Sequence, residues 1–160
     1  MALEAALDVA VRRVKVPQRA ANAAAVNFVS EQTHQLADGL GVSTNELAIG
    51  GRSFGGRVCS MAAAEGLDIG ALALLSYPLH PPGKPDRLRV DHFPQIVVPC
   101  LFVSGTRDPF GKREEFDARV GKIRGPVATR WLEGDTHAPK PSFNDEIGRV
   151  VRDWLAEFKR

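Results

Sequence analysis

A serine between glycines is the residue of this sequence best suited to act as a nucleophile. Residues 51–55, Gly-Arg-Ser-Phe-Gly, fit the pattern G-x-S-x-G and lie between a predicted strand and a predicted helix, the context that the motif requires. A serine on such a sharp turn takes strained backbone angles and brings the residues two before and two after it close together. Gly51 and Gly55 leave space for this approach, and Gly56 adds to it. The pattern predicts a nucleophile elbow at Ser53.

Two residues further along the chain can activate this serine. A serine hydroxyl is a weak nucleophile, so it needs a base, usually histidine, and the base needs an acid that orients it. Asp108 and His137 each follow a predicted strand, in the order serine, aspartate, histidine that one large class of hydrolases uses. Asp135 is an alternative acid, but it is so near His137 in sequence that a role in the turn is favoured. If these residues have no catalytic role, Asp108 is a helix cap or turn residue and His137 is a surface residue.

Four further side chains are candidates for contact with a substrate. Arg52 and Arg107 stand beside the candidate triad residues, where an arginine binds an anionic group or forms a salt bridge within the protein. His80 and His92 belong to a proline-rich loop over residues 78–99. For these two histidines an ordinary loop role is favoured over substrate contact.

The elements that must position these residues follow from hydrophobic spacing. Apolar residues at intervals of three and four predict helices over residues 3–14, 19–39, 55–65 and 147–158. Ser142 and Asp145 fit a capping box for the last helix, and a short helix is expected near residues 87–92. Short apolar runs predict strands over residues 46–50, 71–76, 99–104 and 127–132. Strands that alternate with helices predict an α/β fold, a truncated and mostly parallel sheet of about four strands covered by helices on both faces.

Length and composition are those of an ordinary globular domain. The 160 residues are 44% hydrophobic and 25% charged, and a chain of this size buries a hydrophobic core without disulfides. No repeat or linker divides the chain. We expect a single domain over residues 1–160, with a helical part over residues 1–45 and the elbow and sheet over residues 46–160.

Charge and cysteine content argue against several classes of protein. The formal net charge is +2, which predicts no binding to nucleic acid or to a membrane surface. The longest apolar run, residues 71–75, is far shorter than the roughly 20 residues of a membrane helix, and Glu4 and Asp8 are untypical of a signal peptide. Cys59 and Cys100 are predicted to be buried thiols without metal-like spacing. We expect a cytoplasmic protein with no metal and no cofactor.

Three blocks of sequence, in this order, resemble the α/β-hydrolases. They are residues 49–57 around Ser53, residues 76–85, Ser-Tyr-Pro-Leu-His-Pro-Pro-Gly-Lys-Pro, and residues 101–111 around Asp108. The resemblance is strongest to the small bacterial members related to dienelactone hydrolase, in the branch similar to the testis-expressed hydrolase-like proteins and to a regulatory subunit of the NSL acetyltransferase complex. It implies Ser53 as nucleophile, Asp108 as acid and His137 as base, and it implies no known substrate. A small acyl molecule is the substrate that the triad chemistry itself predicts.

The amino end departs from this family. Such proteins begin with several strands, and a His-Gly-rich segment after the third strand donates one N–H to the oxyanion hole; here a predicted helix comes first and no such segment is found. The N–H of Phe54, at the start of the helix after the elbow, remains as a donor. Losing one donor typically costs on the order of 10² to 10³ in rate. We also expect the strand before the elbow to form an open, hydrophobic sheet edge, which favours a homodimer.

These observations lead to one main hypothesis and two alternatives. The main hypothesis is a serine hydrolase that cleaves an ester, a thioester or a similar acyl substrate. The first alternative is an interaction module that keeps the triad residues without a working site. The second is a shortened product of a longer hydrolase.

Overall fold

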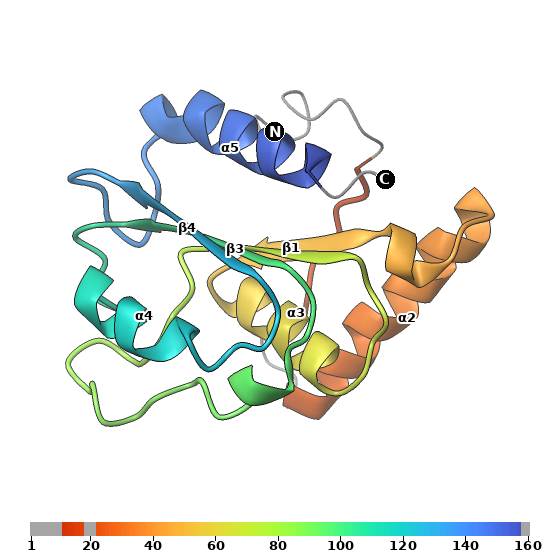
Figure 1. Cartoon of the computed structure of the whole chain (residues 1–160), viewed down its shortest axis with the longest axis horizontal. Helices are drawn as coiled ribbons and strands as arrows, with labels where there is room; N and C mark the ends of the chain where they lie inside the picture. Colours follow the sequence, from red (N-terminus) through yellow and green to blue (C-terminus); the bar gives the residue numbers. More distant parts are fainter. Residues whose placement is uncertain (1–10, 18–21, 158–160) are drawn as a thin grey trace.

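The computed structural model of the chain describes residues 11–17 and 22–157 and arranges them around one parallel sheet (Figure 1). The strands are β1 (Ala48–Arg52), β2 (Ala71–Leu75), β3 (Cys100–Gly105) and β4 (Val127–Leu132). They follow one another across the sheet in chain order, and every neighbouring pair is parallel. The predicted fold class, a truncated parallel α/β sheet, is confirmed.

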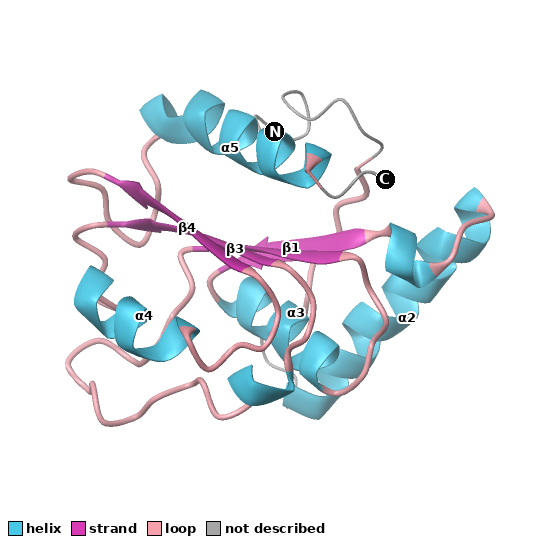
Figure 2. Cartoon of the chain, in the orientation of Figure 1, coloured by secondary structure: helices cyan, strands magenta, loops and turns pink. Residues whose placement is uncertain are grey.

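Helices cover both faces of the sheet (Figure 2). On one face lie α3 (Phe54–Ala64) and α4 (Arg113–Val120), and α5 (Asn144–Ala156) lies on the other. The helix α2 (Asn22–Leu40) packs against α3. The helices predicted over residues 19–39, 55–65 and 147–158 are therefore present among the described residues, and α5 begins three residues earlier than predicted. Residues 19–21 and 158 lie outside the described residues. Within the described ranges, none of the helices is both long and apolar enough to cross a bilayer.

Two predictions about helix ends are wrong. Ser142 does not cap α5, because Pro141 already starts a 3₁₀ turn, η3 (Pro141–Phe143), and the N-cap residue is Phe143, without a side-chain cap. In the proline-rich loop the helical turn is η2 (Phe93–Gln95), later than the predicted residues 87–92. Pro94 explains this shift, since its fixed φ suits the first turn of a helix.

Only the last part of the predicted first helix, residues 3–14, can be compared with the structure. Residues 1–10 lie outside the described residues. Residues 11–17 contain no helix. Pro17 contributes to this difference, because a proline disfavours the helical conformation of the residue before it.

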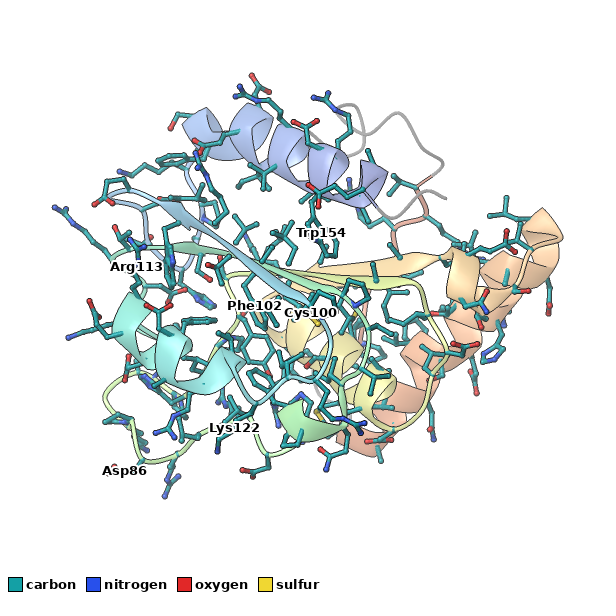
Figure 3. All side chains as sticks on the ribbon, viewed as in Figure 1. Asp86, Cys100, Phe102, Arg113, Lys122 and Trp154 are labelled. Carbon is teal, nitrogen blue, oxygen red and sulfur yellow. The ribbon has the colours of Figure 1, made fainter. Side chains whose placement is uncertain are left out.

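Successive strand residues supply two separate cores. Leu72, Leu74 and Phe102 point to the face of α3 and α4, whereas Leu101 and Val103 pack with Trp154 of α5. Figure 3 shows the side chains of Phe102 and Trp154 on opposite sides of the sheet. Because both faces of these parallel strands are buried, their sequences are continuous apolar runs rather than alternating patterns.

The two cysteines are free and buried, as predicted. Burial raises the pKa of Cys59 and of Cys100 to about 12 in each case. Thiols that stay protonated at neutral pH are poor nucleophiles and poor metal ligands. Both cysteines therefore serve as small apolar side chains of the core.

β1 forms one edge of the sheet. Among the described residues it pairs with β2 alone, so its other side is unpaired. Its only large apolar side chain is Ile49, which is half-buried, so the edge is open but less hydrophobic than the sequence analysis expected. The predicted homodimer through this edge stays a prediction.

The long loop between β2 and β3 is held to α3 by hydrogen bonds. The hydroxyl of Tyr77 donates to the carbonyl oxygen of Arg89 over 2.8 Å. The Nε2–H of His92 donates to the Oγ of Ser60 over 2.8 Å, since the Ser60 hydroxyl itself donates to the carbonyl oxygen of Arg57. The rings of Tyr77 and Phe93 also pack together, with centroids 5.5 Å apart. The loop is therefore well anchored although it contains only a short helical turn.

His92 makes the stability of this anchor dependent on pH. Burial and the charge of Arg57 lower its pKa from 6.5 to about 4. The unfolded chain therefore binds a proton between these pH values that the folded chain does not bind, and the contribution of neutral His92 is lost as the pH falls from 6.5 toward 4. We expect the free energy of unfolding, measured by urea denaturation, to fall more steeply across this window in the wild type than in His92→Gln. Equal slopes would contradict this role of His92.

Candidate active site

Ser53 lies at the sharp junction between β1 and α3. Its backbone angles are φ +52° and ψ −118°, a conformation that L-residues rarely adopt and that costs about 1 to 3 kcal/mol. The Ser53 N–H donates to the carbonyl oxygen of Leu75 over 2.9 Å, which ties the turn to the end of β2. Ser53 thus has the strained strand-to-helix geometry that the sequence pattern predicts.

The glycines around Ser53 have different steric roles. A Cβ at Gly51 would lie 2.7 Å from the carbonyl carbon of Gly55, and one at Gly56 would lie 2.6 Å from the carbonyl oxygen of Gly51. A Cβ at Gly55 would meet nothing within 4 Å. The predicted need for a glycine at position 55 is therefore wrong, because a Cβ there would enter open space. Gly51 and Gly56 are the two glycines that the close approach requires.

Alanine substitutions can test this assignment. We expect Gly51→Ala to destabilise the protein by about 3 kcal/mol, because the new methyl group would overlap backbone that cannot rotate away. Gly55→Ala is the matched control and should be neutral or stabilising by up to about 1 kcal/mol, since alanine favours a helix over glycine. Urea denaturation of both variants measures the difference. Equal destabilisation would show that the close approach is at Gly55 after all.

His137 joins Ser53 to Asp108 through its two ring nitrogens. Its Nε2 lies 2.7 Å from the Ser53 Oγ, and its Nδ1 lies 2.8 Å from the Asp108 Oδ2. A carboxylate only accepts hydrogen bonds, so Nδ1 carries the proton and Nε2 is free to accept from the serine hydroxyl. The Asp108 side chain is 1% exposed and that of His137 is 21% exposed. The acid is thus shielded from water while the histidine remains reachable.

The parallel sheet brings these three residues together from distant parts of the chain. Ser53 follows β1, Asp108 follows β3 and His137 follows β4, so all three lie beyond the carboxyl edge of the sheet. Open α/β sheets bind their ligands at this edge. Gly105 at the end of β3 allows the approach of the turn before His137, because a Cβ there would lie 2.8 Å from the backbone nitrogen of Thr136.

Asp135, the alternative acid, is buried but does not contact His137. Its Oδ2 accepts a hydrogen bond from the Lys140 N–H over 3.3 Å, and its carbonyl oxygen accepts one from the Arg107 N–H over 2.8 Å. These bonds tie the turn after β4 to the turn after β3 and to the segment that follows His137. The geometry therefore favours Asp108 as the partner of His137 and a turn role for Asp135.

Phe110 is a site residue to which the sequence analysis gave no role. Its ring stacks on the His137 imidazole, with centroids 3.9 Å apart and an interplanar angle of 28°. Its N–H donates to the Asp108 Oδ1 over 2.8 Å, and its carbonyl oxygen accepts from the His80 N–H over 3.2 Å. The signal in the sequence was an aromatic residue two positions after the candidate acid. Phe110 holds the histidine and the aspartate in a fixed relative position.

His80 lies behind this group and supports it. Its Nδ1–H donates to the carbonyl oxygen of Pro81 over 2.8 Å, and its Nε2 lies 3.2 Å from the Glu115 carboxylate. The side chain is 6% exposed, so it packs inside the protein rather than facing a substrate. The loop role that the sequence analysis favoured for His80 is consistent with this placement.

The backbone N–H of Phe54 is the candidate oxyanion donor. Phe54 is the first residue of α3, and an α-helix leaves its first N–H groups without an intrahelical acceptor. The positive end of the helix dipole adds to the attraction for negative charge at this point. Arg52 and Arg107, the two arginines beside the site, are both exposed.

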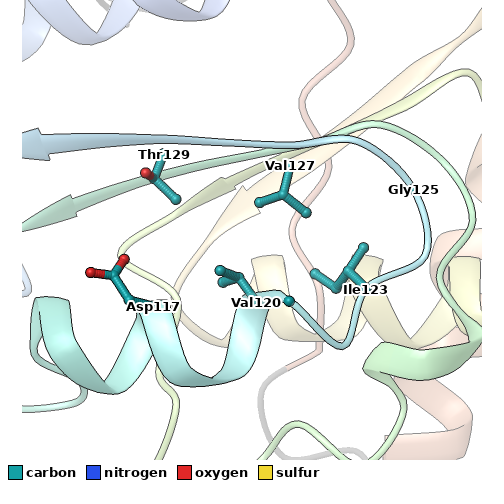
Figure 4. Close-up of a pocket in the computed structure, with 7 residues that line it drawn as sticks. Asp117, Val120, Ile123, Gly125, Val127 and Thr129 are labelled. Carbon is teal, nitrogen blue, oxygen red and sulfur yellow. The ribbon is translucent and has the colours of Figure 1, made fainter.

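One cavity of the protein lies away from this site. It has a volume of about 420 Å³ and is found between α4 and β4 (Figure 4). Residues such as Asp117, Val127 and Thr129 line it, and none of the three candidate triad residues does. This cavity is therefore separate from the space around Ser53.

A parallel sheet that brings a serine on a strand-to-helix turn, a histidine and a buried aspartate to its carboxyl edge defines a protein of the α/β-hydrolase class. The chain belongs to the family described as an alpha/beta hydrolase domain, whose family model matches residues 10–153. The matched residues make up the greater part of the chain and include Ser53, Asp108 and His137.

Solved structures share the fold at low sequence identity. An esterase domain from a Rhodothermus marinus protein has a TM-score of 0.76 at 16% identity, covering 98% of this chain and 78% of its own. The Paleococcus ferrophilus monoacylglycerol lipase has a TM-score of 0.66 at 14% identity, covering 84% of this chain and 76% of its own. A Mycobacterium tuberculosis puromycin-hydrolyzing peptidase has a TM-score of 0.66 at 18% identity, covering 83% of this chain and 25% of its own. The chain thus spans about a quarter of the puromycin-hydrolysing proteins that it matches.

Proposed function

We propose that the protein is a serine hydrolase that cleaves an ester, a thioester or a similar acyl substrate. The observation that carries the proposal is the hydrogen-bonded chain from Ser53 Oγ through His137 to Asp108, with distances of 2.7 Å and 2.8 Å. An activated nucleophile is recognised by this arrangement of a nucleophile, a base and a group that orients the base. Two of the proteins that share this fold, an esterase domain and a lipase, support an acyl substrate.

The proposed reaction has two stages. Ser53 Oγ attacks the carbonyl carbon while His137 Nε2 takes the hydroxyl proton, and the Asp108 carboxylate stabilises the resulting imidazolium. The negative oxygen of the tetrahedral intermediate lies against the Phe54 N–H. His137 then gives the proton to the leaving alcohol or thiol, and an acyl-enzyme remains on Ser53. In the second stage a water oxygen attacks the acyl carbon while His137 Nε2 takes a proton from the water. The bond between the acyl carbon and Ser53 Oγ then breaks, His137 returns the proton to Ser53 Oγ, and the acid is released.

The finer family assignment is part of the same proposal. The three blocks that resemble the small bacterial hydrolases related to dienelactone hydrolase contain Ser53, Asp108 and the loop between β2 and β3. We place the chain in that branch on this resemblance. A series of p-nitrophenyl esters of increasing acyl length would measure which acyl groups the protein accepts.

A fluorophosphonate probe tests for an activated serine without knowledge of the substrate. We expect the purified chain to gain the mass of a single adduct, and we expect Ser53→Ala and His137→Ala to gain none, because labelling needs both the nucleophile and its base. Circular dichroism would establish that each variant is folded. A folded wild-type chain that gains no adduct would overturn the proposal and favour the interaction module.

We expect the stacked ring of Phe110 to support turnover because it positions the His137 imidazole. We expect Phe110→Leu to lower kcat by up to about tenfold, because an aromatic contact of this kind contributes about 0.5 to 1.5 kcal/mol. The backbone bond from residue 110 to Asp108 remains in this variant. The split between kcat and KM is the second measurement, since a ring that positions His137 should act on kcat and leave KM unchanged. A variant with unchanged kcat would show that the stacking is only structural.

A further inference from the structure

A second groove lies between α3 and the long loop that follows β2. Its volume is about 270 Å³. Arg57 and Met61 of α3 line it together with Glu65, the C-cap residue of that helix, and their spacing of four residues places them along one side of the helix. The rest of the lining comes from the loop, from Leu88, Arg89, Asp91 and His92. None of the candidate triad residues lines this groove, so it is distinct from the site around Ser53.

The two arginines of the groove lack partners of opposite charge. Among the described residues, the ion pairs of the protein involve neither Arg57 nor Arg89, although Glu65 and Asp91 line the same groove. The Nε of Arg57 is buried and has no hydrogen-bond partner in the described part of the chain. A buried donor without an acceptor is costly and is rare in native proteins. The geometry thus leaves a cationic donor pointing at no protein acceptor.

The positive groups are also close enough to repel one another. Burial is the largest cause that lowers the pKa of Arg89, and the positive charge of Arg57 is the second. The same two causes, in the same order, lower the pKa of His92. The loop cannot easily move away, because Tyr77 holds the Arg89 carbonyl oxygen and Ser60 holds the His92 ring. An anion between the two guanidinium groups would relieve this repulsion.

We propose that this groove is a binding site for an oxyanion, a carboxylate or phosphate group, held by the guanidinium groups of Arg57 and Arg89. Guanidinium is planar, carries five N–H donors and is only weakly hydrated, so it suits paired hydrogen bonds to the oxygens of these anions. The Nε–H of Arg57 gains its missing acceptor in the bound state. This proposal does not depend on catalysis by Ser53.

The groove begins close to the nucleophile elbow in the chain. The Arg57 N–H donates to the Ser53 carbonyl oxygen over 3.0 Å, so Arg57 lies one helical turn after the proposed nucleophile. The groove continues from Arg57 past Met61 to Glu65, just beyond the end of α3. An anion held by Arg57 would therefore lie at the end of the groove that is nearer to Ser53 in the chain.

Titrations with inorganic phosphate and with acetate test the site. Heteronuclear NMR spectra of the full chain would follow the backbone amides at constant ionic strength, with chloride as the balancing anion, because general screening would otherwise imitate binding. We expect saturable shifts at residues 57, 61 and 88–92 with at least one of the two anions. The anion that saturates at the lower concentration identifies the preferred group.

Matched variants separate a binding site from a charged surface. Arg57→Gln and Arg89→Gln should each weaken binding about tenfold or more, the usual effect of losing a hydrogen bond to a charged group. Arg87→Gln is the control, because Arg87 is an exposed arginine of the same loop that does not line the groove. Shifts that rise linearly without saturation, or an equal loss in Arg87→Gln, would overturn the proposal.

Thermal unfolding provides a second, independent readout. Phosphate or acetate bound to the folded state should raise the unfolding temperature of the wild type relative to chloride. Arg57→Gln should lose this increase, and in chloride alone its unfolding temperature should not fall, because the substitution removes the repulsion between like charges. A lower unfolding temperature of Arg57→Gln in chloride, with no response of the wild type to either anion, would show that Arg57 is a structural residue and would overturn the proposal.

Discussion

Replacement of Ser53 by alanine is expected to lower kcat for an acyl ester about 10⁶-fold, the size of effect seen when a serine protease loses its nucleophile. The reason is that no other group of the site can form the acyl-enzyme. Alanine tolerates the strained φ of +52° about as well as serine does, so the fold should be preserved. Initial rates with a p-nitrophenyl ester, from enzyme purified without wild-type contamination, measure the loss.

Ser104→Ala is the control for this prediction. Ser104 lies near the carboxyl end of β3, is 2% exposed, and its Oγ has no hydrogen-bond partner among the described residues. Its replacement should leave kcat unchanged. If Ser53→Ala retained wild-type turnover, hydrolysis would have to come from another group, and the proposed role of Ser53 would be wrong.

Asp108→Asn is expected to lower kcat about 10⁴-fold, as the corresponding change does in a serine protease. The carboxylate now accepts the Nδ1–H of His137 and the N–H of Phe110. In the variant, the carbonyl oxygen of asparagine can still accept from Phe110, but its NH₂ group then faces His137 and favours the tautomer with the proton on Nε2. A protonated Nε2 cannot accept the proton of Ser53, so the base is lost while the packing is kept.

Asp135→Asn tests the alternative acid under the same conditions. Asp135 is as deeply buried as Asp108, but its bonds are to the turn and not to His137. We expect kcat to fall less than tenfold and the free energy of unfolding to decrease, since a turn bond is weakened. Steady-state kinetics and urea denaturation of the two variants separate the roles. A larger loss of kcat in Asp135→Asn than in Asp108→Asn would reverse the assignment of the acid.

Much of the fold could be predicted from the sequence because its signals are local. The runs over β2 and β3 are apolar since both sheet faces are covered, and the strand before Ser53 ends at glycines that permit the sharp turn. The spacing of apolar residues predicted α2, α3 and α5. It did not single out α4, whose residues are mostly charged and whose buried face consists mainly of Phe116.

The sequence by itself determined that a strained serine turn, an aspartate and a histidine follow three different strands, because local sterics and chain order express these features. Only the tertiary structure decided which glycine meets Gly51, which aspartate contacts His137, and that the ring of Phe110 stacks on it. It also decided that Arg57 and Arg89, far apart in the chain, share one groove. The physical reason is that these contacts depend on the register of the sheet and on the path of its loops, and no spacing within one segment encodes either.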